Sequence, residues 1–235
     1  MRRPKRLLAL ALQAGLLLGA GAASAAHPLD FAPADTAYVF GTLEPVDAEV
    51  AAAWIARDAR LPGLYAPMLK QMLAQSPQGA DKQGRALLKA LDRELEGRSL
   101  AELMQRWGLS TQPRAALYGL GPLPVLRLEL EDTTRFREAL LRFAGSAALK
   151  LQRTEFEGLE LFQLPPADAE PEGDGPRTEL LLALHGQHLV LALLPQAGDE
   201  ALRRKVLGLD RPAQSVLSSG RLQALNQRFA LLPHA

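Results

Sequence analysis

Residues 179–194 read ELLLALHGQHLVLALL, and this stretch decides the class of fold. Its two apolar runs flank Gly186-Gln187, and a two-residue loop that contains glycine typically joins antiparallel strands in a tight hairpin. Both runs are apolar at successive positions instead of alternate ones, which is the pattern of strands that are covered on both faces. The stretch therefore predicts a central β-hairpin with protein packed on each side.

Two more hairpins are predicted before this one. Strands at 114–120 and 123–130 surround a turn rich in glycine and proline, and in the second strand Arg127 and Glu129 alternate with leucines. Strands at 149–156 and 159–164 flank Glu157-Gly158. A short β-branched and aromatic run at 37–43 ends at Glu44-Pro45 and predicts one further strand.

The segment between Val46 and Leu109 has helical spacing instead. One apolar stripe contains Leu64, Met68 and Met72, and breaks at Pro62-Gly63, 76–79 and Gly97 divide the segment into three or four short helices. We expect these methionines, with Trp54 and Trp107, to fill gaps in the core between packed helices. Later helices are predicted after the N-cap residue Asp132, at 198–209 and at 220–229.

These elements predict an α+β fold in which antiparallel hairpins form a sheet with helices packed on it, preceded by a helix-rich segment. We divide the chain into a signal peptide at 1–25, a strand and helical segment at 37–112, and a hairpin-rich segment at 113–235, the last two forming one domain. Residues 115–143 and 180–209 share the order strand, glycine turn, strand, acidic cap, helix. An internal repeat and the simple reuse of a common unit both explain this likeness.

The N-terminus has the three parts of a secretory signal peptide. RRPKR at 2–6 precedes an apolar run at 7–18, and Ala23-Ser24-Ala25 supplies small residues for cleavage. The apolar run is shorter than the roughly 20 residues that span a bilayer. We therefore predict export to the periplasm, cleavage after Ala25 or Ala26, and no stable membrane anchor in the mature protein. The chain has no cysteine, so it has neither a site for lipid attachment nor a disulfide framework.

Charge and composition argue against nucleic acid as a partner. Cleavage after Ala25 would remove four basic side chains and change the balance from 27 basic against 26 acidic residues to 23 against 26. Aromatic residues are only 5% of the chain, and no basic patch with interleaved aromatics is present.

His185 and His188 are the candidate metal ligands. They bracket the Gly186-Gln187 turn, so their Cβ atoms should lie about 5 Å apart across the hairpin. Two imidazoles at that separation can hold a metal ion, but a zinc site needs a third ligand and usually a fourth, which no nearby motif supplies. Ordinary turn-flanking histidines are the competing interpretation.

Two other segments have a ligand-like pattern. If cleavage follows Ala26, His27 becomes the amino terminus and can chelate copper through its amine and ring, although a loose terminus is the favoured interpretation. Asp168, Glu170, Glu172 and Glu179 have the spacing of a calcium-binding EF loop. Glutamates at two positions that prefer shorter side chains, and two prolines, favour a solvated loop instead. The sequence shows no nucleophile elbow, phosphate loop or dinucleotide motif, and it predicts no cofactor.

FAPADTAYVFGTLEPV at 31–46, together with ALYGLGPLPVLRLEL at 116–130 and the acidic cap and helix that follow, resembles a group of uncharacterised exported proteobacterial proteins. The resemblance implies an envelope protein and brings no catalytic residue with it. Our first hypothesis is a non-enzymatic protein that binds an envelope protein or component. The alternative is a periplasmic hydrolase or metal-dependent enzyme that uses His185 and His188. The apolar ending ALLPHA and the repeated unit favour a longer protein with a second, similar half.

Overall fold

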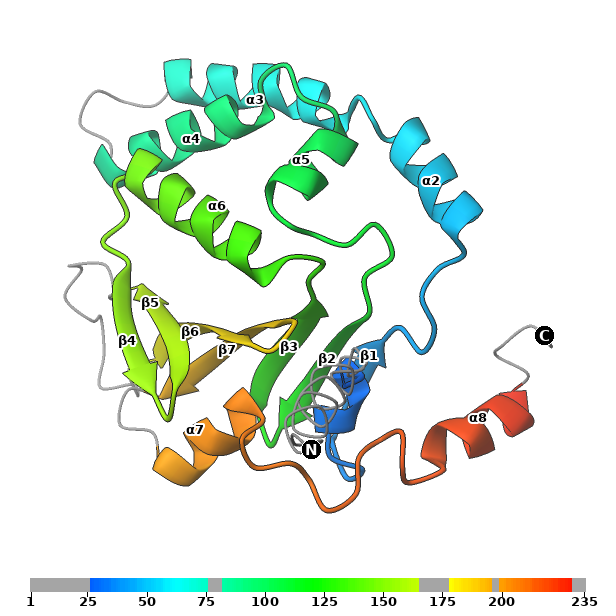
Figure 1. Cartoon of the computed structure of the whole chain (residues 1–235). Helices are drawn as coiled ribbons and strands as arrows, with labels where there is room; N and C mark the ends of the chain where they lie inside the picture. Colours follow the sequence, from blue (N-terminus) through cyan, green and yellow to red (C-terminus); the bar gives the residue numbers. More distant parts are fainter. Residues whose placement is uncertain (1–25, 76–81, 165–177, 196–198, 230–235) are drawn as a thin grey trace, which may run out of the picture.

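In the part of the chain that the structure describes, the fold is one antiparallel sheet of seven strands with helices on both faces (Figure 1). The computed structural model describes residues 26–75, 82–164, 178–195 and 199–229. The predicted α+β class is confirmed. The predicted signal peptide at 1–25 lies outside the described residues.

The strands form three hairpins and one short edge strand. β1 (Val39–Gly41) pairs with the hairpin β2 (Ala115–Leu120) and β3 (Leu123–Glu129), and the other two hairpins are β4 (Gln152–Phe156) with β5 (Leu159–Leu164) and β6 (Thr178–His185) with β7 (His188–Pro195). The order across the sheet is β1-β2-β3-β7-β6-β5-β4. The predicted central position of the 179–194 hairpin is therefore confirmed, because β7 is the middle strand. The prediction of protein on both faces holds only in part, since the cross-strand partners Leu180 and Leu193 are 39% and 44% exposed.

The helices lie in two sets. Between β1 and β2 the chain forms α2 (Ala48–Arg57), α3 (Leu61–Gln75), α4 (Lys82–Leu95) and α5 (Leu100–Arg106), and the remaining helices are η1 (Pro28–Phe31), α6 (Thr133–Ser146), α7 (Glu200–Leu207) and α8 (Arg221–Phe229). Side-chain caps start several of them. Ser99 and Glu102 form a capping box at α5, and Asp132 caps α6 as predicted.

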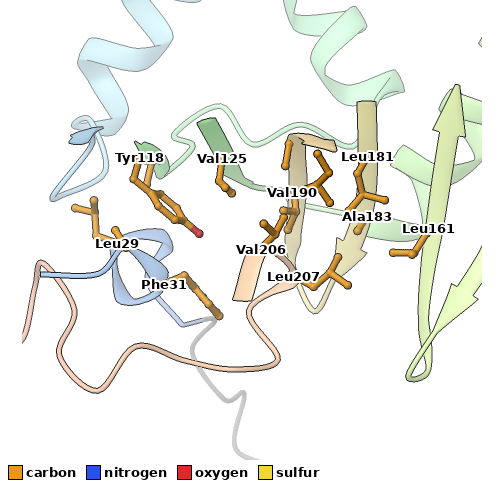
Figure 2. Packing of buried hydrophobic residues seen from close by; sticks show 14 of the residues in the cluster. Leu29, Phe31, Tyr118, Val125, Leu161, Leu181, Ala183, Val190, Val206 and Leu207 are labelled. Carbon is orange, nitrogen blue, oxygen red and sulfur yellow. The ribbon is translucent and has the colours of Figure 1, made fainter. Parts of the chain in front are cut away.

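Opposite faces of the sheet are covered by different helices. On one face Phe136 of α6 packs with Leu130 and Leu189, and α4 and α3 are stacked outside α6 (Figure 1). On the other face α7 and η1 pack over the larger core cluster, which includes Leu29, Phe31 and Val206 (Figure 2). The units β2–β3–α6 and β6–β7–α7 thus share an element order but send their helices to opposite faces.

The η1 segment belongs to the core, although the sequence predicts no element at these residues. Leu29, Phe31 and Ala32 are buried against the sheet, and their backbone is tied to the 214–216 segment through Ala32 and Ala34. β1 pairs with β2, and the side chains of η1 belong to the core cluster. The first strand and the hairpin-rich segment therefore share one sheet and one core.

The prediction that Met68, Met72 and Trp54 fill the core is wrong. About half of each side chain is exposed, whereas Trp107 packs edge-on against Phe136 and Phe143. The reason is that α3 is apolar on more than one side, so the spacing of its apolar residues does not show which side is buried. The structure buries Pro62 and Ala66 and leaves the Leu64–Met68–Met72 side outward.

Gly208 at the end of α7 allows the core to close at this point. Its φ is +80°, and a Cβ at this position would lie 2.5 Å from Phe31 and 2.7 Å from Arg127 Nη2. Gly158 has the same φ of +80°, but nothing lies within 4 Å of the position of its Cβ. Alanine at Gly158 would therefore suffer backbone strain alone, whereas alanine at Gly208 would suffer both backbone strain and steric overlap.

We predict that Gly208→Ala lowers the free energy of unfolding by about 3 kcal/mol, the sum of left-handed backbone strain and overpacking. Gly158→Ala should lower it by about 1 kcal/mol, from backbone strain alone. Urea unfolding of both variants measures the difference, and equal losses would contradict the tight packing at Gly208.

Candidate functional site

The two predicted ligands lie on the face of the sheet that η1 covers. His185 ends β6 and His188 begins β7, and the two residues are direct partners across the hairpin, as predicted. Both rings pack edge-on against Phe31, with ring centroids 6.2 Å away for His185 and 5.6 Å away for His188. The structure therefore brings both imidazoles to one aromatic side chain from η1.

The surroundings lower the pKa of both histidines and so favour the neutral imidazole. Burial lowers the pKa of His185, although the ring also contacts the backbone carbonyl of Leu207 through Nδ1 at 2.9 Å. His188 is only 3% exposed, and burial, followed by the nearby Arg127 charge, lowers its pKa to about 4. Its Nε2 has no hydrogen-bond partner among the described residues.

A neutral imidazole is the form that binds metal, so the protonation state suits the predicted metal role. The described residues contain no group of three His, Cys, Asp or Glu side chains that could hold a metal ion. Glu129 is the carboxylate paired with His188 in the sheet, and Arg114 binds both of its oxygens, at 2.6 and 2.7 Å. The metal assignment to His185 and His188 stays a prediction.

A buried arginine lies beside these histidines, and no motif in the sequence marked it as functional. Arg127 stands in the middle of β3 and is 0% exposed, with its guanidinium carbon 3.8 Å from the centroid of Phe31. Its Nη2 donates to the carbonyl of Val206 at 3.2 Å. Among the described residues its Nε and Nη1 have no hydrogen-bond partner, and its charge is not paired with a carboxylate.

The alternation of Arg127 and Glu129 with leucines is typical of a strand with one polar, solvated face. In this structure η1 and α7 cover the face that carries Arg127, so this side chain lies in the core. Tyr118 on β2 is also 0% exposed, and its hydroxyl lies beside the Arg127 guanidinium without forming a well-aligned hydrogen bond. Burial raises the pKa of Tyr118, and the neighbouring Arg127 charge opposes this effect. Figure 2 shows the hydroxyl directed toward η1.

A pocket of about 450 Å³ opens next to Phe31. Its walls come from the η1 segment, the β2–β3 turn, α7 and the 210–213 segment. Arg211 lines it, with the guanidinium carbon 4.9 Å from the centroid of Phe31. Phe31 therefore contacts one buried and one exposed arginine.

Two further segments are candidate ligand sites by their sequence, namely His27 and the calcium-like loop that ends at Glu179. The expectation of a loose terminus at His27 is wrong, since its ring accepts from Leu29 N at 3.1 Å and contacts the carbonyl of Leu43 at 2.9 Å. His27 thus caps η1. Of the calcium-like loop, residues 168–177 lie outside the described residues, and Glu179 accepts hydrogen bonds from Arg203 and Gln163.

A second feature is an exposed apolar surface on α3, which we call the α3 stripe (Leu64, Tyr65, Met68 and Met72). The exposed fractions of its side chains lie between 49% and 68%. Trp54 on the preceding helix α2 is 51% exposed. Helical spacing did reveal the stripe, but it could not tell an outward side from an inward one.

Comparison with known proteins adds no assignment. No protein-family model, curated protein or solved structure matches the chain. Among the helices that the structure describes, none is both long enough and apolar enough to cross a membrane.

We predict that stability falls on acidification through His188. The unfolded chain takes up a proton on this ring below pH 6.5, whereas the folded chain does so only near its pKa of about 4. The unfolded state therefore binds more protons in this window, and the free energy of unfolding drops by about 2 kcal/mol between pH 7 and pH 4.5 from this group alone.

Urea unfolding of the wild type and of His188→Leu at both pH values measures this contribution. Carboxylates titrate in both proteins, so the difference between the two pH dependences isolates the imidazole. The variant should lose less stability than the wild type. An identical loss in the two proteins would show that the pKa of His188 is not lowered in the folded state.

Proposed function

We propose that this protein is a non-enzymatic binding protein of the bacterial cell envelope, exported by a cleaved signal peptide, and that it recognises a partner protein through the α3 stripe. The observation that carries the proposal is the exposure of four large apolar side chains on one helix. Contiguous apolar surface of this kind is uncommon on a monomer unless it binds something.

The composition of the stripe supports a protein partner. Tyrosine and methionine are enriched in the cores of protein interfaces, and flexible methionines adapt to varied partner surfaces. The opposite side of the helix packs on α4, and Lys70 of α3 pairs with Glu96, which follows α4, at 2.8 Å. A helix that is already packed on a neighbouring helix loses little backbone entropy when its outer side binds.

The export part of the proposal rests on residues 2–25, with their basic, apolar and small-residue parts. The absence of cysteine from the chain agrees with a mature protein released without a lipid anchor. The resemblance to exported proteobacterial proteins points the same way.

The alternative, a hydrolase or metal-dependent enzyme built on His185 and His188, has less support. His188 is almost completely buried under Phe31, where a substrate would have to displace core side chains to reach it. The positive charge of Arg127 near both rings also opposes the binding of a metal cation.

We predict that the full chain, produced in a Gram-negative host, appears in the periplasmic fraction with a mature N-terminus at Ala26 or His27. The small residues Ala23, Ser24 and Ala25 set the expected position of cleavage. Intact mass of the periplasmic protein gives the cleavage site. A protein that keeps residues 1–25 or remains in the cytoplasm would contradict export.

We predict that the double variant Leu64→Glu, Met68→Glu abolishes capture of the partner from a periplasmic extract, because charge on the stripe cannot be desolvated. Both side chains are exposed, so the melting temperature should change by at most about 2 °C. Leu225→Glu on α8 is the matched control, an exposed leucine on another helix. Partners retained equally by both variants would rule out the stripe as the binding surface.

A further inference from the structure

Two arginines share the ring of Phe31, and no carboxylate of the described residues pairs with either. The guanidinium carbons of Arg127 and Arg211 lie 3.8 and 4.9 Å from its centroid. Arg127 is 0% exposed and leaves Nε and Nη1 without partners, while Arg211 is at the surface. Arg127 is desolvated and its charge is uncompensated, so an anion that binds at the nearby Arg211 is attracted by both guanidinium groups.

The pocket beside Phe31 has the size and chemistry of a small-molecule site. Its volume of about 450 Å³ lies within the usual range of ligand pockets. Most of its wall is apolar. The apolar lining residues are Phe31, Pro33, Leu120, Leu202, Pro212 and Ala213.

The charges around the pocket have a small positive excess. Lys205 and Arg211 line it, and Arg127 lies behind Phe31. Asp210 also lines it, but Arg204 binds this carboxylate at 2.8 Å. Arg204 also binds Glu157, so it offsets the charge of Asp210 only in part. Asp35 is the other acidic residue in the lining and has no ion pair among the described residues. The two cations and two carboxylates of the lining therefore balance, and the buried charge of Arg127 supplies the positive excess.

We propose that this pocket binds a small carboxylic acid anion with an apolar body. The apolar body lies between Leu120 and Leu202, and the carboxylate binds Arg211 beside Phe31. Lys205 adds a second positive charge at the surface. Arg127, which is desolvated behind the ring, attracts the same anion through its uncompensated charge. This site lies on the η1 face and is independent of the α3 stripe.

Octanoate and octanol test the proposal, because they share an apolar body and differ in charge. Isothermal titration with the whole mature protein should show one octanoate per chain, with octanol bound at least about tenfold more weakly, the worth of a charge-assisted hydrogen bond. In a proton–nitrogen NMR spectrum, the Nε–H signal of Arg127 should move with octanoate and stay in place with octanol. Equal affinity for the two ligands, or an unmoved Arg127 signal, would overturn the proposal.

Variants locate the site. Arg211→Met should weaken octanoate binding about tenfold, whereas Arg60→Met, which removes the same charge from an exposed position between α2 and α3, should leave it unchanged. Ala213→Trp fills the pocket without altering charge and should abolish binding. If Arg211→Met and Arg60→Met bind alike, or if Ala213→Trp binds as the wild type does, octanoate does not occupy this pocket. Neither Arg211 nor Ala213 is buried, so these variants should fold, which circular dichroism checks.

Discussion

The buried guanidinium of Arg127 connects three parts of the molecule that lie far apart in the sequence. It extends from the middle of the sheet, stacks on Phe31 of η1, and donates to the carbonyl of Val206 near the end of α7. A buried charge without a carboxylate is normally costly. Here the partial negative charge at the C-terminus of α7 and the face of Phe31 take the place of an acidic partner.

The end of α7 is shaped by this contact. The last carbonyls of a helix have no partner inside it, and those of Val206 and Leu207 contact Arg127 and His185. Gly208 then turns the chain in a left-handed conformation. Phe31 and Arg127 lie so close to it that a Cβ would not fit there. The lowered pKa values of His185 and His188 result from the same crowding, since burial and the Arg127 charge both disfavour an imidazolium.

The two binding surfaces that we propose lie on opposite sides of the sheet (Figure 1). The α3 stripe belongs to the layer of helices outside α6, and the pocket beside Phe31 belongs to the layer of η1 and α7. This separation arises because the two strand–turn–strand–helix units place α6 and α7 on opposite faces. A protein partner on one side would therefore leave the pocket on the other side open.

The sequence by itself determined the local elements. Glycine turns between apolar runs predicted all three hairpins, and Asp132 predicted the start of α6, because turn and cap chemistry act within a few residues. The unbroken apolar pattern of 179–194 predicted its central place in the sheet. His185 and His188 were likewise placed correctly opposite each other. Only the tertiary structure decided which faces are buried. Arg127 looked solvated, and the α3 methionines looked buried, because a periodic pattern shows that a strand or helix has distinct sides but does not show which distant segment covers each side. The segment that covers Arg127 is η1, almost a hundred residues earlier in the chain, and that contact depends on the packing of the whole domain.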